Sequence, residues 1–508
     1  MKTFAARAGA AALLSAGLIF TGPHAEGRAV PVHWKKCTGS YLRLLDCADL
    51  QVPLDYTNPT GTMITVALDR ARHTGNAKQY QGVLLVNPGG PGGSGRNYGA
   101  DVAAALPANL RRAYDVIGFD PRGVGGSRPA LSCMPGYFKP VRPDYVPGDN
   151  EKMWLERSKA YAEACGRKYG PVLDHMKTTD VVGDMDAIRA ALGAKKINFY
   201  GGSYGTYLGA VYATVYPTRV RRMVLDSNVR PSGAWYGANL DQDTAFDASV
   251  KSFFGWIARY DSTYHLGRTE AVVERAYYAL RAKLAKSPAA GVVGADELDD
   301  TIQIGGYLAP AWPLLAKAWS DYTVKKDSGS LVDRYRAWGA GKEEEFAVYN
   351  AVQCTDVAWP KDWQVWKADA QRIDATAPYL VWGNTWFNAP CLYWPAKPGT
   401  PVAITSRQGL PPVLLLQATL DAATPYQGGV EMHGLLKGSR LVIEDGGRTH
   451  VIALRGNRCI DRIFDDYLAT GRLPADRTHC QRVPDPVPIA PSRRLSLVGV
   501  EPMSSGNG

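Results

Sequence analysis

Apolar and polar residues follow two different patterns along the first half of the chain. Between residues 35 and 75 they alternate one by one, as in antiparallel strands with one buried face. Later, short unbroken apolar runs are each followed by a helical pattern. These runs lie at 82–86, 114–119, 197–200 and 220–225. Repeated strand and helix alternation predicts a parallel sheet covered by helices.

The alternation stops between residues 231 and 400, where the period is helical and aromatic residues are frequent. Two apolar runs, 411–417 and 440–444, then restore the strand pattern. The pattern therefore predicts an α/β core in two parts, separated by an inserted helical cap. The predicted segments are core 36–230, cap 231–400, core 401–485 and a loose Pro- and Ser-rich tail 486–508.

The first residues have the features of a targeting segment. Lys2 and Arg7 accompany the apolar run 10–20, which is too short to span a bilayer and typical of a signal-peptide core. We predict a signal peptide at 1–29, with cleavage after Ala25 or Ala29; the alternative is a buried N-terminal helix. No later stretch has the roughly 20 apolar residues of a membrane span. We therefore expect a soluble, secreted protein.

The cysteines are consistent with export. The chain has eight, and none forms a C-x-x-C pair, which argues against zinc ribbons and thioredoxin-like redox sites. An even number in an exported chain indicates disulfides. Eight cysteines allow about 105 connectivities, and loop closure alone favours sequence neighbours. The neighbour pairs are Cys37–Cys47, Cys133–Cys165, Cys354–Cys391 and Cys459–Cys480.

Composition is that of an ordinary globular protein, with 45% hydrophobic and 21% charged residues. The net charge of +10 is spread over the chain, without a long basic arm that contains aromatic residues. We interpret the excess as a solvated surface and expect no nucleic-acid partner.

Residues 201–205 contain a candidate nucleophile. The sequence Gly-Gly-Ser-Tyr-Gly follows an apolar strand pattern and precedes a helical one, as in a G-x-S-x-G nucleophile elbow. The glycines at 201 and 205 remove Cβ atoms that would clash where the chain reverses. We therefore predict that Ser203 is a catalytic nucleophile. The alternative is a simple turn, because the chain contains 53 glycines.

A serine nucleophile needs a base and a group that orients the base. Asp421 follows the predicted strand 411–417, and His450 follows the predicted strand 440–444. Such positions meet at one edge of a parallel sheet, and the order Ser, Asp, His is that of α/β-hydrolases. We predict that Asp421 orients His450. A turn or cap role for Asp421 stays open, and Asp445 is too close to His450 in sequence to be the usual acid.

The tetrahedral oxyanion of such a reaction needs main-chain N–H donors. The glycine-rich segment 87–95 follows the early strand 82–86 and allows the main chain to approach a substrate carbonyl. The N–H groups of Gly90 and Tyr204 are the candidate donors. A phosphate-binding loop is disfavoured because no Gly-Lys-Ser/Thr follows.

Four ordered segments resemble a known family, the secreted bacterial tripeptidyl aminopeptidases of the proline-iminopeptidase-like branch of the α/β-hydrolases. They are NPGGPGGSG (87–95), FDPRGVGGS (119–127), INFYGGSYGTYLG (197–209) and DAATP (421–425). The resemblance covers nearly all the mature chain. It implies an α/β-hydrolase fold with a helical cap, and exopeptidase action on the free N-termini of peptides or proteins. It also implies the roles above for Ser203, Asp421 and His450, oxyanion donors near Gly90 and Tyr204, and no metal or organic cofactor.

Two positions differ from proline iminopeptidases. The oxyanion segment begins with Asn87 where those enzymes usually have His, and Thr449 precedes His450 where Gly is frequent. These departures argue against strict proline-iminopeptidase specificity. The family also contains carboxylesterases, so a secreted carboxylesterase or lipase with the same triad is the alternative enzyme. A binding protein on a decayed hydrolase scaffold is disfavoured by the intact set of residues.

An aminopeptidase must also recognise a protonated substrate N-terminus, and a partly desolvated carboxylate does this well. The candidates are Asp241, Asp243, Asp247 and Asp356. Each of them has an alternative role as a surface or capping residue.

Overall fold

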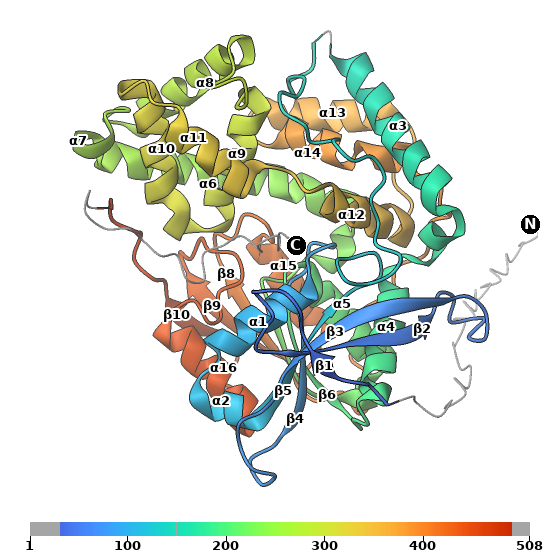
Figure 1. Ribbon diagram of the computed structural model, residues 1–508. Coiled ribbons are helices and arrows are strands. Elements are labelled where there is room, and N and C mark those ends of the chain that lie inside the picture. The colour runs from blue at the N-terminus through green and yellow to red at the C-terminus, as the bar shows by residue number, and fades with distance from the viewer. Residues whose placement is uncertain (1–30, 149, 490–508) are drawn as a thin grey trace, which may run out of the picture.

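The structure, a computed structural model, describes residues 31–148 and 150–489. The predicted signal peptide 1–29 lies outside the described residues, as do residues 490–508 of the predicted tail. Figure 1 shows a sheet domain with a layer of helices above it.

Ten strands form one sheet in the described part of the chain, in the order β1-β2-β3-β5-β4-β6-β7-β8-β9-β10. The first three strands and the β3–β5 pair are antiparallel, and every pair from β5 to β10 is parallel. The bounds are β1 Lys35–Lys36, β2 Asp46–Pro53, β3 Met63–Ala71, β4 Gly82–Asn87, β5 Tyr114–Asp120, β6 Ile197–Gly202, β7 Val220–Asp226, β8 Leu414–Ala418, β9 Arg440–Asp445 and β10 Thr478–Gln481. The predicted antiparallel entry strands and the predicted parallel sheet are both present.

Helices cover both faces of this sheet because its strands are apolar on both sides. On one face α1, α2 and α16 pack against side chains such as Leu84 and Val224. On the other face α4, α5 and α15 pack against the next side chain along each strand, such as Leu85 and Leu225, which points the opposite way. The bounds are α1 Gly95–Ala105, α2 Ala108–Ala113, α4 Thr178–Ala191, α5 Tyr204–Val215, α15 Tyr426–Leu435 and α16 Arg458–Thr470.

The chain between β7 and β8 forms most of the helical layer above the sheet (Figure 1). Its helices are α6 Tyr236–Arg259, α7 Asp261–Tyr264, α8 Glu270–Lys286, α9 Ala295–Tyr307, α10 Trp312–Val324, α11 Gly329–Arg334, α12 Glu343–Asp356, α13 Trp363–Asp374 and α14 Val381–Asn388. Short turns of 3-10 helix are η1 Gly170–His175, η2 Pro217–Arg219, η3 Pro231–Gly233, η4 Ala309–Ala311 and η6 Ala389–Leu392, and η5 Tyr335–Gly339 is a π-helix. The aromatic side chains of this stretch are largely buried in its interior.

A second segment joins this layer. Helix α3 (Glu151–Tyr169), between β5 and α4, lies beside α13 and α14 in Figure 1. Trp154 of α3 stacks on Trp386 with ring centroids 5.8 Å apart, and Glu151 pairs with Lys367 at 2.8 Å. The helical layer therefore comes from two stretches of the chain. The predicted cap 231–400 included the stretch between β7 and β8 but not helix α3.

Four disulfides link sequence neighbours. They join Cys37 to Cys47, Cys133 to Cys165, Cys354 to Cys391 and Cys459 to Cys480. No helix in residues 31–148 and 150–489 is both long and apolar enough to cross a membrane.

The end of the described chain returns to the helical layer. The indole N–H of Trp256 donates to the main-chain oxygen of Pro486 over 2.7 Å, and Arg259 pairs with Asp485 at 3.0 Å. The first residue of the predicted tail thus contacts α6.

Candidate active site

Ser203 stands at a sharp turn between β6 and α5. Its φ of 56° and ψ of −128° lie in a region that non-glycine residues rarely adopt. Its N–H donates to the main-chain oxygen of Asp226 on β7 over 3.1 Å, which fixes the turn to the neighbouring strand. Gly205 allows the turn to pack closely, since a Cβ there would lie 2.7 Å from the oxygen of Asn87.

Asp421 and His450 meet in loops that follow adjacent strands, β8 and β9. The imidazole Nδ1 lies 2.9 Å from Oδ2 of Asp421 and 3.0 Å from Oδ1. The same carboxylate accepts the N–H groups of Ala423 and Thr424 over 2.9 and 3.0 Å, and the Thr424 hydroxyl over 3.0 Å. The turn role and the partner role of Asp421 are therefore combined in one buried carboxylate.

Asp445, the last residue of β9, has a different histidine as its partner. Asp445 lies 3.0 Å from Nδ1 of His479, at the exposed edge of the sheet formed by β10. Its carboxylate is thus engaged on β10, away from the pair that Asp421 forms with His450.

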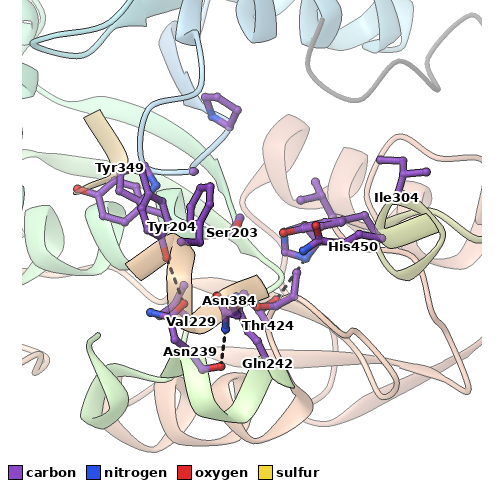
Figure 2. A pocket seen from close by; sticks show the side chains of 18 of the residues that line it. Ser203, Tyr204, Val229, Asn239, Gln242, Ile304, Tyr349, Asn384, Thr424 and His450 are labelled. Carbon is purple, nitrogen blue, oxygen red and sulfur yellow. Dashed lines mark hydrogen bonds between the residues drawn. The ribbon is translucent and has the colours of Figure 1, made fainter. Parts of the chain in front are cut away.

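Ser203 and His450 line the same cavity, which has a volume of about 1880 Å³ and is lined by residues of both the sheet domain and the helical layer. Figure 2 shows both among the side chains that surround it. The helical layer also holds the histidine directly. The N–H of His450 donates to the oxygen of Tyr307 at the end of α9 over 2.8 Å, and the two rings pack edge to face 5.6 Å apart.

The loop after β4 approaches the elbow closely. Gly90 lines the cavity beside Tyr204, and a Cβ on Gly89 would lie 2.8 Å from the amide nitrogen of Tyr204. Asn87, which stands where proline iminopeptidases usually have His, accepts the N–H of Gly89 on its side-chain oxygen over 3.0 Å. Within the part of the chain that the structure describes, neither the Gly90 nor the Tyr204 amide donates a hydrogen bond to the protein. The two residues that line the cavity here are thus the ones predicted as oxyanion donors.

Two of the four predicted amine-binding aspartates are engaged with cations. Asp241 lines the cavity but pairs with Arg230 at 2.6 Å. Asp247 is buried and pairs with Lys251 one helical turn further along at 2.7 Å.

The other two are buried among neutral partners. Asp243 accepts the amide group of Asn384 over 2.8 Å, and burial raises the pKa of its carboxyl well above the usual range. Asp356 accepts the N–H and the hydroxyl of Thr178, each over 2.6 Å, and the indole N–H of Trp235 over 3.1 Å. Burial raises the pKa of Asp356 to about 6. Neither residue lines the cavity.

The cavity is also lined by a carboxylate that was not among the candidates predicted from the sequence. Helix α12 begins with three glutamates, and the first two are occupied. Glu343 accepts hydrogen bonds from residues 132–134 and from Tyr161, and Glu344 accepts the N–H of Gly125 over 2.7 Å. Glu345 faces the cavity with 42% of its side chain exposed, and Lys342 is 4.0 Å away. An acidic first turn is a normal helix feature, so the sequence contained no signal that distinguished Glu345.

Comparison with known proteins agrees with this geometry. Residues 377–480, which include Asp421 and His450, match the family model described as TAP-like protein. The chain is 44% identical over 465 residues to a tripeptidyl aminopeptidase of Streptomyces lividans, covering 88% of this chain and 86% of that protein. The chain belongs to the tripeptidyl aminopeptidase family. The family resemblance and the α/β-hydrolase fold predicted from the sequence are thereby confirmed.

Two further relatives of this chain have other names. The chain is 30% identical to serine protease Hip1 of Mycobacterium tuberculosis, covering 89% of this chain and 91% of that protein. It is 32% identical to carboxylesterase B of the same organism, covering 88% and 89%.

Proposed function

We propose that this protein is a secreted serine exopeptidase that releases short peptides, in the first instance tripeptides, from the free N-termini of peptides and proteins. The observation that supports it best is the Asp421–His450 pair on the same cavity as Ser203, which stands at a strained elbow. The names of its Streptomyces and Mycobacterium relatives, tripeptidyl aminopeptidase and serine protease, agree with this reaction.

In the proposed mechanism Ser203 attacks the scissile carbonyl while Nε2 of His450 takes the hydroxyl proton. Asp421, held by Ala423 and Thr424, keeps Nδ1 protonated and stabilises the imidazolium. The tetrahedral intermediate collapses as His450 gives its proton to the leaving amine, and an acyl-enzyme remains. Water then attacks the acyl group with His450 again as the base.

The oxyanion of both tetrahedral intermediates would be bound by the N–H groups of Gly90 and Tyr204. Their two segments pack closely against one another, which would keep the donors in place as charge develops. Tyr204 is the first residue of α5, whose positive end adds to the stabilisation.

We further propose that Glu345, rather than the aspartates named above, binds the substrate ammonium group. Its two neighbouring glutamates accept hydrogen bonds from the protein. Glu345 retains a partly exposed carboxylate in the cavity, and its ion pair with Lys342 is long, at 4.0 Å. A carboxylate of this kind forms a charge-assisted hydrogen bond with an amine. Three extended residues span about 10 Å, which a cavity of 1880 Å³ accommodates.

The alternative is a carboxylesterase, since carboxylesterase B is a relative of similar length. The test compares three substrates: a tripeptide anilide with a free amine, the same anilide N-acetylated, and a short-chain ester. Preference for the free amine by more than tenfold in kcat/KM supports the aminopeptidase. Equal rates on both anilides would contradict the proposal that the enzyme binds the substrate amine. Hydrolysis of the ester alone would favour the carboxylesterase.

Secretion is supported by the four disulfides and by the targeting features of residues 1–29. N-terminal sequencing of protein recovered from a culture medium tests it. A mature chain that starts after Ala25 or Ala29 is the expected result.

A further inference from the structure

Asp226 contacts both the nucleophile turn and the loop of the base. It is the last residue of β7, and its main-chain oxygen accepts the N–H of Ser203 over 3.1 Å. Its carboxylate accepts the N–H groups of Ile452 and Ala453, two and three residues after His450, over 3.0 and 2.8 Å. One buried residue thus connects two segments that are about 250 positions apart in the sequence.

The next residue adds a third link to the same loop. The hydroxyl of Ser227 accepts the N–H of Val451 over 2.8 Å. Val451 also packs on the elbow, since a Cβ on Gly202 would lie 2.9 Å from one of its methyl groups. Asp226 and Ser227 together therefore bind the three consecutive N–H groups that follow His450.

The backbone at this junction is strained in three places. Ser203, Ser227 and Val451 have φ values of 56°, 65° and 58°. For a β-branched residue such as Val451 the left-handed region is a marked outlier, which persists only where the surrounding structure imposes it. The hydrogen bonds to Asp226 and Ser227 hold the three residues after His450 in this conformation, beside the bond from the His450 N–H to Tyr307.

We propose that Asp226 and Ser227 act as a clamp that sets the position of His450 relative to Ser203. They are positioning residues, because neither is needed to touch the substrate. The proposal rests on the serine-hydrolase mechanism proposed above. Displacing a proton-transfer group by about 1 Å costs on the order of 100-fold in rate.

A carboxylate is required at position 226 because its donors surround it. Besides the two N–H groups of the loop, the hydroxyl of Tyr200 donates to it over 3.1 Å. An asparagine keeps one oxygen and places an NH₂ group against one of these donors, so it cannot satisfy both loop amides. Asp226→Asn therefore breaks the clamp with almost no change in volume.

The test uses three variants of the full chain: Asp226→Asn, Ser227→Ala and, as the matched control, Tyr200→Phe. The control removes a donor from the same carboxylate but leaves both links to the loop. We expect kcat to fall about 100-fold in Asp226→Asn and at least 10-fold in Ser227→Ala, with KM within twofold of wild type. Tyr200→Phe should retain kcat within threefold.

A second measurement separates this proposal from the proposed function. A fluorophosphonate labels Ser203 at a rate that depends on His450, whatever the natural substrate. Slower labelling of folded Asp226→Asn and Ser227→Ala, with full final stoichiometry, supports the clamp. If both variants are labelled at the wild-type rate, the clamp proposal is wrong. If the wild-type protein itself is never labelled, the serine-hydrolase assignment is wrong instead. If Asp226→Asn fails to fold, Ser227→Ala, which loses only a hydroxyl, decides the question.

Discussion

The main-chain oxygen of Glu345 lies against Gly92: a Cβ on Gly92 would come within 2.7 Å of it. Gly92 belongs to the loop that also contains the proposed oxyanion donor Gly90, and Glu345 lies in the first turn of helix α12 of the helical layer. The two halves of the cavity are therefore in contact beside the proposed reaction centre. A change in either surface is expected to alter the other.

Substituting Gly92 by Ala should disturb this contact. The new methyl group would collide with main chain, and Gly92 has a φ of +108° that alanine rarely adopts. We expect kcat/KM to fall at least tenfold on a tripeptide anilide. Gly136→Ala is the matched control, because Gly136 has a φ of +87° but no heavy atom within 4 Å of the point that a Cβ would occupy. Equal losses in both variants would mean that backbone strain alone, and not the contact with Glu345, causes the effect.

Substituting Glu345 by Gln should weaken binding of the substrate ammonium group. A charge-assisted hydrogen bond contributes about 1.5–3 kcal/mol, so kcat/KM on the free tripeptide anilide should fall about 10- to 100-fold, chiefly through KM. Turnover of the N-acetylated anilide should stay as in wild type. Glu344→Gln removes the same charge one residue away, and its carbonyl can still accept from Gly125. Glu345→Gln with unchanged selectivity for the free amine would exclude this anchor.

Variants of the catalytic residues should lose nearly all activity. Ser203→Ala is expected to lower kcat on the order of 10⁶-fold, and Asp421→Asn on the order of 10⁴-fold. Steady-state kinetics on the tripeptide anilide measures both. Ser252→Ala, on α6, removes an exposed hydroxyl that donates to Ala248 and should have no effect. Substantial turnover by Ser203→Ala would show that another nucleophile acts.

The conformational stability should depend on pH through Asp69. This residue is 1% exposed on β3, and burial raises the pKa of its carboxyl from 3.8 to about 8, against the opposing effect of Arg96. Because the pKa is higher in the folded state, its contribution to stability is present in acid and is lost as the pH rises from about 4 to 8. Asn does not titrate. The free energy of unfolding of Asp69→Asn, relative to that of wild type, should therefore increase by up to about 1.4 kcal/mol for each pH unit over this range.

Urea unfolding at pH 5 and pH 8 checks this prediction. Asp49→Asn, on the neighbouring strand β2, changes an exposed carboxylate and should show no such trend. A difference between Asp69→Asn and wild type that is the same at both pH values would contradict the assignment.

The sheet could be predicted because its signals are local. The apolar runs at 82–86 and 197–200 lie within β4 and β6, and Ser203 stands between β6 and α5 as the elbow motif predicts. The strand order is a consequence of how parallel strands connect, which explains why Asp421 and His450 were placed at one edge from the chain order alone.

Other features depend on long-range packing and have no local signal. Strand β10 (Thr478–Gln481) is short and polar, and only its pairing with β9 defines it. The burial of Asp243 and Asp356 depends on Asn384 and Thr178, which lie more than 100 residues away in the sequence. Glu345 differs from Glu343 because residues 132–134 and Tyr161 bind the carboxylate of Glu343.

The position of α3 beside α13 and α14 has a consequence for protein engineering. A chimaera that grafts residues 231–400 onto another hydrolase core would leave Trp386 without Trp154 and Lys367 without Glu151. Transplanting substrate selectivity between relatives would therefore require moving two separate gene segments together.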